Sequence, residues 1–480
     1  MPDDVEQHVD APMIVDWDGP DDPDNPKNWP NPKRWGITIL NSLFMFVSPV
    51  SSSMVAPAFA SIKSDLDIGS DFEVQMVLSI FILASAVGPL IISPLSEVYG
   101  RRPVLHATCL LYLVFNLACP FAKTKGQLMS FRFLSGIGGS APSIGGGILA
   151  DCWRSHERGR SLSFYYIFPL IGPACGPIIG GFVVQNATWH WMFYATSILS
   201  AAVQVCGLFW LPETYEPAIL RQKAKQLRRD ASPGQTQNVC TKYDEESHWD
   251  TLSHAMIRPF KLLCTQPIIQ LLALLIAYVF GLMYLALSTF AAVWVDIYKE
   301  SPSMAGLNYI SLALGFSLAT QICAPINDAL YARLQQRNGG VGRPEFRIPL
   351  LVPGVILVPV GFFWYGWSVQ ATLHWIMPNI GALLFASGIT TSMQCTTSYI
   401  VDSYSMYAAS ATAATTVLRA LAGFAFPLFA PYMYTSLGHG WGNSLLACLA
   451  ILLGWPSAWL FWVYGETLRR KSPYAAHLSD

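Results

Sequence analysis

Long apolar runs separated by short polar stretches form the main pattern of the chain. Crossing the hydrocarbon core of a bilayer takes about 20 mainly apolar residues, and runs of that length recur along the sequence. The pattern predicts spans near residues 36–58, 74–96, 103–122, 127–150, 161–185, 190–212, 267–292, 303–327, 348–369, 374–398, 408–435 and 441–464. We therefore predict an all-α membrane protein with twelve transmembrane helices in two six-helix halves, 36–212 and 267–464.

Polar segments flank and divide these halves. In the N-terminal tail, 1–35, the first 26 residues are rich in Asp and Pro and contain no Lys or Arg, which predicts disorder. In the linker, 213–266, the stretch from Arg221 to Arg229 predicts a short basic helix on the anionic inner leaflet. We expect the rest of the linker to be disordered, and residues 465–480 form a C-terminal tail.

The basic residues orient the chain. Most of the 29 Lys and Arg residues fall in the tails, the linker and alternate loops, which are cytoplasmic if the N-terminus is cytoplasmic. Both termini and the linker are therefore expected inside the cell, at what we call the inner end. Asn186-Ala187-Thr188 is a glycosylation sequon in a short outer loop close to the membrane, so we expect it to be unused.

Composition narrows the function classes. The chain is 52% hydrophobic and 12% charged, with a net charge of -1, whereas soluble proteins carry about 25% charged residues. A nucleic-acid partner is therefore not indicated. The ten Cys residues include no CxxC pair, and the sequence contains no GxxxxGK[ST] loop, so neither a metal site nor ATP drive is indicated. Spans without paired His, Cys or acidic residues also argue against an enzyme.

Glycines mark one face of the fifth span. Gly172, Gly176 and Gly180 recur every four residues, and a face without side chains lets another helix come close. Pro177 removes a backbone donor and should bend the helix. We expect Gly176 and Gly180 to press on a helix of the C-terminal half and Gly181 to lie off this face. Ordinary glycine packing is the alternative.

Charged residues gather at the inner mouth after the second span. Glu97, Gly100, Arg101 and Arg102 combine an acid, a turn residue and two cations within six positions. Such charges could pair with neighbouring helix ends in one conformation and separate in another. A simple positive-inside anchor remains the alternative.

Two arginines lie inside spans. Placing an Arg at the centre of a span costs roughly 2.5–3.5 kcal/mol or more, so Arg132 and Arg419 should face a cavity or a partner. Arg132 could instead snorkel to the outer interface. Asp151 and Arg158, near the next inner loop, complete the candidate gating and coupling residues.

Aromatic and amide side chains are candidates for lining a substrate cavity, although each could also be a packing residue. They are Asn41, Tyr165, Tyr166, Tyr278, Phe280, Tyr284, Gln321, Gln394 and Phe424. The spans contain no firmly embedded Asp or Glu, which favours a neutral or weakly anionic, partly apolar solute over a polycation. No titratable residue stands out as a proton carrier.

Several motifs resemble those of the major facilitator superfamily. Residues 172–181 match its fifth-helix antiporter motif, GxxxGPxxGG. Residues 95–103 are similar to its loop signature GxLxDRxGRR, with Ser93, Glu97 and Val98 as departures. Residues 132–138 resemble its RxxxGxG motif, and Asp328 with Arg333 is a reduced echo of the loop signature.

The wider resemblance is to fungal twelve-span drug:proton antiporters. It rests on residues 25–29, 211–215, 344–347, 426–429 and 464–466, together with Arg419. The resemblance implies a secondary exporter of drugs or fungal secondary metabolites, driven by a proton gradient without a cofactor. It also implies that Glu97, Gly100, Arg101 and Arg102 lock the inner gate and that Arg132 takes part in proton transfer.

Other functions stay open at this stage. They are an uptake permease for a small organic anion or nutrient, a polyamine exporter, a membrane enzyme and a transporter-like sensor. We expect a functional monomer in the lipid bilayer that binds a small-molecule substrate. The plasma membrane is the expected location, with the vacuolar membrane as the alternative.

Overall fold

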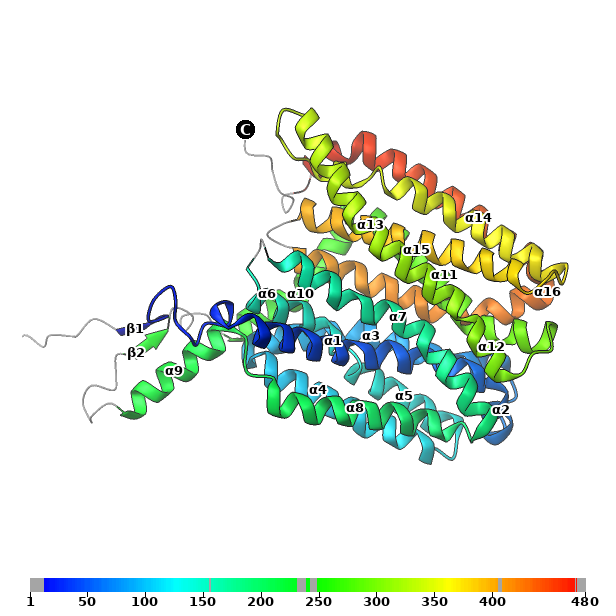
Figure 1. Ribbon diagram of the computed structural model, residues 1–480, viewed down its shortest axis with the longest axis horizontal. Helices are drawn as coiled ribbons and strands as arrows, with labels where there is room; N and C mark the ends of the chain where they lie inside the picture. The colour runs from blue at the N-terminus through cyan, green and yellow to red at the C-terminus, as the bar shows by residue number, and fades with distance from the viewer. Residues whose placement is uncertain are drawn as a thin grey trace, which may run out of the picture.

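Long helices lying side by side form one bundle (Figure 1). The computed structural model describes residues 13–154, 157–230, 239–241, 248–404, 408–470 and 472. Helices from the first part of the chain occupy one side of the bundle and those from the last part occupy the other (Figure 1). Strand β1 (Met13–Val15) and the last turns of α16 (Ala408–Arg470), drawn in red, lie at the same end, as expected for a shared inner end (Figure 1).

The N-terminal half is built from six spans. It contains α1 (Asn31–Ser53), α2 (Phe59–Asp65), α3 (Asp71–Tyr99), α4 (Arg101–Ala118), α5 (Lys125–Gly138), α6 (Pro142–Cys152), α7 (Arg158–Asn186) and α8 (His190–Trp210). Ser70 caps α3 by accepting a hydrogen bond from the Phe72 backbone N–H. The predicted span 127–150 is two helices, because α5 ends in glycines and Pro142 starts α6.

The C-terminal half repeats this plan. It contains α11 (Pro267–Ala292), α12 (Pro302–Asn308), α13 (Ile310–Arg337), α14 (Leu351–Gln370), α15 (Ile376–Ser403) and α16 (Ala408–Arg470). Helix α11 continues as a π-helical turn, Val293–Ile297. Helix α16 contains two spans, because Gly438 has φ +73° and breaks the helical conformation at the outer end.

Ten helices in the described part of the chain are long and apolar enough to cross a membrane. Helix α16 accounts for two spans, and α5 with α6, each too short alone, forms one more. The twelve-span, all-α prediction is therefore confirmed.

Apolar side chains also cover the outside of the bundle. On α13, Leu314, Leu318 and Ile322 are exposed at four-residue intervals and are 47%, 47% and 53% accessible. Such a stripe would be unfavourable in water and is suited to contact with lipid.

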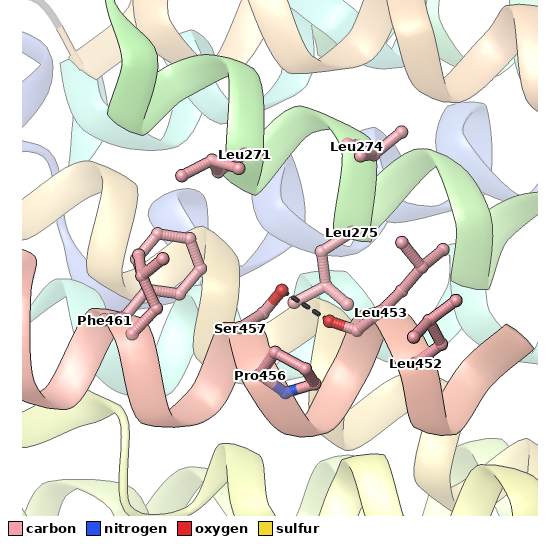
Figure 2. Close-up of a pocket in the computed structure, with 9 residues that line it drawn as sticks. Leu271, Leu274, Leu275, Leu452, Leu453, Pro456, Ser457 and Phe461 are labelled. Atoms are coloured by element: carbon pink, nitrogen blue, oxygen red, sulfur yellow. Dashed lines mark hydrogen bonds between the residues drawn. The ribbon is translucent and has the colours of Figure 1, made fainter.

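A small groove opens on this surface between α11 and α16 (Figure 2). Its volume is about 160 Å³, below the roughly 300–1,000 Å³ of drug-sized sites. Its lining is apolar except for Ser457, whose hydroxyl donates to the Leu453 carbonyl at 2.5 Å. The groove is therefore too small for a drug-sized substrate.

The tail and the linker meet at the inner end. β1 pairs in parallel with β2 (Val239–Thr241), and Val15 packs against Ala224 of α9 (Glu216–Asp230). Lys223 Nζ lies 2.7 Å from Asp18 Oδ2. The prediction of disorder is therefore wrong for residues 13–26, because the tail gains strand and ion-pair partners from the linker. Residues 1–12 lie outside the described part of the chain.

Two linker predictions also need correction. Helix α9 forms as predicted, but it points away from the end of the bundle rather than across it (Figure 1), so its placement on the inner leaflet is wrong. A further helix, α10 (His248–Thr265), forms where disorder was expected, because it packs on α3, α11 and α16. Helix α10 thus contacts both halves, whereas residues 231–238 and 242–247 lie outside the described residues.

Candidate functional site

Glu213 caps the inner end of α4. Its Oε1 accepts the Arg101 backbone N–H at 2.9 Å and its Oε2 accepts that of Arg102 at 3.1 Å. First-turn N–H groups have no partner within their own helix, and the helix dipole favours an anion there. Gly100 has φ +99°, and a Cβ at this position would lie 2.6 Å from Glu213 Oε2. The loop motif therefore needs glycine for both its conformation and its contact.

Asp151 lies beside Arg101, at the end of α6 and so at the inner end of the fourth span. Arg101 Nε donates to Asp151 Oδ2 at 3.3 Å, and the Thr214 hydroxyl donates to the same oxygen at 3.4 Å. Asp151 therefore joins the end of α6 to the start of α4 and to the segment that follows α8.

The other residues of this motif have separate contacts. Arg101 Nη1 donates to the Ser96 hydroxyl at 2.7 Å, and Arg102 Nη2 donates to the Leu208 carbonyl at 2.9 Å. Glu97 is exposed at the end of α3. In the structure Arg101 therefore contacts Asp151 and Ser96. The role of Glu97 in an inner gate stays a prediction.

The C-terminal half has a matching cluster. Arg347, just before α14, contacts Asp328 Oδ1 at 2.6 Å and Asp402 Oδ2 at 2.8 Å. Arg347, rather than Arg333, is therefore the described partner of Asp328. In each half, a cation near the start of the third span contacts an acid at the end of the fourth span. The pairs are Arg101 with Asp151 and Arg347 with Asp402. Both clusters join helices within one half, as an internal repeat would predict.

Arg132 is fully buried and does not reach the outer interface. Its guanidinium donates to the carbonyls of Val77 at 3.1 Å, Ser51 at 3.2 Å and Ser52 at 3.5 Å. Ser51 and Ser52 belong to the last turn of α1, where carbonyls lack helical partners and the dipole is negative. The guanidinium also lies over the Phe81 ring, 4.5 Å from its centroid. Arg132 thus ties α1 to α3 and α5.

A chain of contacts joins Arg132 to Arg419 across the two halves. Tyr284 Oη lies 3.2 Å from Ser52 Oγ, and Tyr284 is the donor because the Ser52 hydroxyl donates to a carbonyl of its own helix. The Tyr284 and Phe280 rings are 4.9 Å apart, and the Arg419 guanidinium lies 4.7 Å from the Phe280 centroid. Both embedded arginines therefore flank a contact between the halves.

The main glycine face of α7 packs inside its own half. A Cβ on Gly172 would lie 2.7 Å from Pro49 Cβ, and one on Gly176 would lie 2.5 Å from the Val50 carbonyl oxygen. A Cβ on Gly180 would meet the carbonyl oxygen of Met54. The expectation that Gly176 and Gly180 press on the C-terminal half is therefore wrong, because their partner is the end of α1.

Gly181 makes the contact with the other half. A Cβ on Gly181 would meet the carbonyl oxygen of Pro302 at the start of α12. Gly306 of α12 faces back, and a Cβ there would lie 3.1 Å from the Pro177 carbonyl oxygen. The two helices therefore touch backbone to backbone. Gly181 lies off the main glycine face, as expected, but it is this residue that meets the C-terminal half.

The candidate cavity residues divide into two groups. Asn41, Tyr165 and Tyr278 are buried between helices of one half: Asn41 Nδ2 donates to the Gly145 carbonyl at 2.9 Å and Tyr278 Oη to that of Leu446 at 2.5 Å. Tyr284 is also buried, at the contact with Ser52. The more accessible candidates are Phe280, Gln394 and Phe424, which are half-buried, and Gln321, which is exposed. The side chains of Arg158 and Tyr166 lie outside the described residues.

Sequence reasoning missed Glu213, Arg347 and Asp402 as members of the inner clusters. An internal signal existed, because Glu213-Thr214 follows the sixth span and Glu466-Thr467 closes the twelfth. Glu466 Oε2 contacts Arg343 at 3.1 Å, again before α14. Comparing the two halves position by position would have found this repeat.

These features define a two-half membrane transporter. The family model of the Major Facilitator Superfamily matches residues 42–427. The chain belongs to the Major Facilitator Superfamily; it is a multi-pass membrane transporter and not an enzyme.

Its relatives carry transport names. The chain is 49% identical to "Efflux pump vrtL" of Penicillium aethiopicum, with 97% of this chain and 92% of that protein covered. It is 44% identical to "Probable efflux pump mfs2" of Aspergillus flavus, with 87% and 99% covered. It is 40% identical to "Efflux pump radE" of Floropilus chiversii, with 97% and 87% covered.

Solved structures share the fold at low sequence identity. One is the Escherichia coli xylose transporter XylE in a partially occluded inward-open conformation, with a TM-score of 0.63, 15% identity and 89% and 98% of the chains covered. Another is a bacterial homologue of the human lysosomal transporter Spinster, with a TM-score of 0.64, 13% identity and 93% and 100% covered.

The two glycine contacts of α7 predict different mutant phenotypes. Gly176→Ala should lower the melting temperature of the purified protein, because overpacking a contact within one half costs about 1–3 kcal/mol in every conformation. Gly181→Ala should fold normally but lose most transport, because only the state with the outer ends joined suffers. Gly126→Ala is the control, since a Cβ there meets nothing within 4 Å. Normal transport by Gly181→Ala would contradict this assignment.

Proposed function

We propose that the protein exports small, partly apolar organic molecules, drugs or fungal secondary metabolites, by proton antiport and alternating access. The observation that carries this proposal is the alignment with proteins named efflux pumps, at 49%, 44% and 40% identity over 97%, 87% and 97% of the chain. The match of residues 172–181 to an antiporter motif supports the same direction of transport.

The conformation supports loading from the cytoplasm. Near the outer end the halves are joined by Tyr284 with Ser52, by Gly181 with Pro302, and by Gln185, whose Oε1 accepts the Ser303 backbone N–H at 3.1 Å. At the inner end, the Arg101 and Arg347 clusters each stay within one half. We assign this arrangement to the inward-facing state, in which an exporter takes up its substrate.

The accessible candidate residues favour a neutral or weakly anionic solute. Phe280 and Phe424 offer aromatic faces, and Gln321 and Gln394 offer amides that both donate and accept. In the described part of the chain, the buried acidic side chains are Asp22 in the tail and Glu345 near α14. A polyamine would lack a carboxylate partner within the spans, so a polyamine exporter is the weaker candidate.

Asp151 is the acid with the best physical basis for proton coupling. It lies at the inner end of the fourth span and contacts Arg101, whose motif resembles the inner gate of the superfamily. Protonation would remove the Asp151 charge and release Arg101 for other partners. Arg132 would act differently, by holding the end of α1 at the contact between the halves. The driving force in this proposal is the proton gradient, without a cofactor.

The same proposal places the protein in the plasma membrane as a functional monomer. Both halves and their contact come from one chain, so no second copy is needed. The vacuolar membrane is the alternative location, because moving the same molecules into the vacuole would also remove them from the cytoplasm. An uptake permease is the alternative function.

Inside-out vesicles with an acidic lumen test the proposal. Neutral and weakly acidic aromatic compounds added outside should release luminal protons, seen as dequenching of the pH dye ACMA. Arg132→Ala should abolish the signal, and Arg132→Lys should retain part of it, because the charge survives without the planar fork of donors. Arg333→Ala, at an exposed inner position, is the control. Uptake of the same compounds only by right-side-out vesicles would favour a permease.

A further inference from the structure

Helix α12 has two unlike sides. This seven-residue helix lies between α7 of the N-terminal half and the body of the C-terminal half. On the α7 side, it presents the Pro302 carbonyl and Gly306. One polar contact accompanies them, from the Ser303 backbone N–H to Gln185 Oε1 at 3.1 Å. Because backbone atoms dominate this surface, α12 and α7 can separate without breaking the hydrogen bonds of buried side chains.

The opposite side of α12 is fastened by a carboxylate and two amides. Asn308 Nδ2, at the end of the helix, donates to Glu300 Oε2 at 2.7 Å. Asn379 Nδ2, on α15, donates to Asn308 Oδ1 at 2.7 Å. Asn379 is 8% accessible, whereas Asn308 and Glu300 are half-buried, so the bond from Asn379 is the better shielded from water of the two, and shielding strengthens a hydrogen bond. Glu300, Asn308 and Asn379 thus link both ends of α12 to α15.

The flanking residues fix the same segment. The Glu300 backbone N–H donates to the Trp294 carbonyl at 3.0 Å, and Lys299 adopts φ +58°, a left-handed conformation that is uncommon for a side-chain-bearing residue. After the helix, Tyr309 is fully buried and its hydroxyl donates to the Leu287 carbonyl of α11 at 2.8 Å. The left-handed conformation of Lys299 persists because the surrounding contacts hold this segment in place.

We propose that Glu300, Asn308 and Asn379 are positioning residues that hold α12 as a fixed part of the C-terminal half, so that its backbone surface seals the outer end against α7. This inference rests on the proposed alternating access. The outer end then opens by separation at the α7–α12 contact, while the bonds of α12 to its own half stay intact. Loosening them should weaken the seal without touching the candidate cavity residues.

Cysteine accessibility from outside the cell tests the seal. Ser303→Cys is the reporter, because the residue is 8% accessible here and its backbone N–H survives the change. Adding Asn308→Ala or Asn379→Ala should raise labelling by a membrane-impermeant maleimide about tenfold, since a lost charge-assisted or buried hydrogen bond shifts the state populations by that order. Glu300→Gln should give a smaller increase, because an acceptor oxygen remains.

Asn186→Ala is the matched control, because this outer asparagine donates to the Phe182 carbonyl of its own helix. The protein with its native cysteines only is the blank. The proposal would be overturned if the Asn308→Ala and Asn379→Ala variants were labelled no faster than the Asn186→Ala control, or no faster than Ser303→Cys alone. The readout needs no substrate, so it stays informative even if proton-coupled export fails.

A cross-link provides an independent test if the alanine variants do not fold. Gln185→Cys with Ser303→Cys should form a disulfide under mild oxidation, since the Gln185 side chain reaches the Ser303 backbone N–H at the seal. The cross-linked protein should lose proton-coupled flux, and reduction of the disulfide should restore it. No disulfide, or full flux in the cross-linked protein, would contradict a separable seal at α12.

Discussion

Helix α7 is in backbone contact with two helices at once, and the arrangement of the two halves depends on this contact. Its glycines every fourth residue bring α7 against α1 inside the N-terminal half, while Gly181 meets α12 of the C-terminal half. Hydrophobic burial gives little preference for helix association within a bilayer, so close packing without side chains carries much of the attraction. Helix α7 can therefore form a permanent contact with α1 and a separable contact with α12.

Polar groups join the helices within each half more firmly than they join the two halves to each other. Arg132 is met by the carbonyls at the end of α1, and each inner cluster joins its cations to acids of the same half. Across the halves, the polar contacts at the outer end are single hydrogen bonds, as between Tyr284 and Ser52. Polar contacts within a half are thus charge-assisted and multiple, whereas the polar contacts named between the halves are single hydrogen bonds, which is compatible with rigid-body rocking.

The sequence predicted the twelve spans well, because apolar length is a strong signal in a bilayer. It failed where tertiary contacts override local composition. The acidic tail is ordered by Lys223 and by β2, both more than two hundred residues away. The four-residue spacing of glycines revealed a close contact but not its partner, since periodicity fixes a helix face and not what covers it. Glu213 was missed because a helix cap becomes visible only when distant segments meet.

Distances between the two halves test the central claim that the outer and inner ends close in alternation. One pair of spin labels would sit at Asn186 and Met304, on α7 and α12, and a second pair at Tyr99 and Arg333, on the inner ends of α3 and α13; all four side chains are exposed. Pulsed electron–electron double resonance in lipid nanodiscs between pH 5 and 8 should show two populations of distances for each pair. The account predicts that the outer distance lengthens in the same population in which the inner distance shortens. Both distances lengthening together, or an outer distance that never changes, would contradict it.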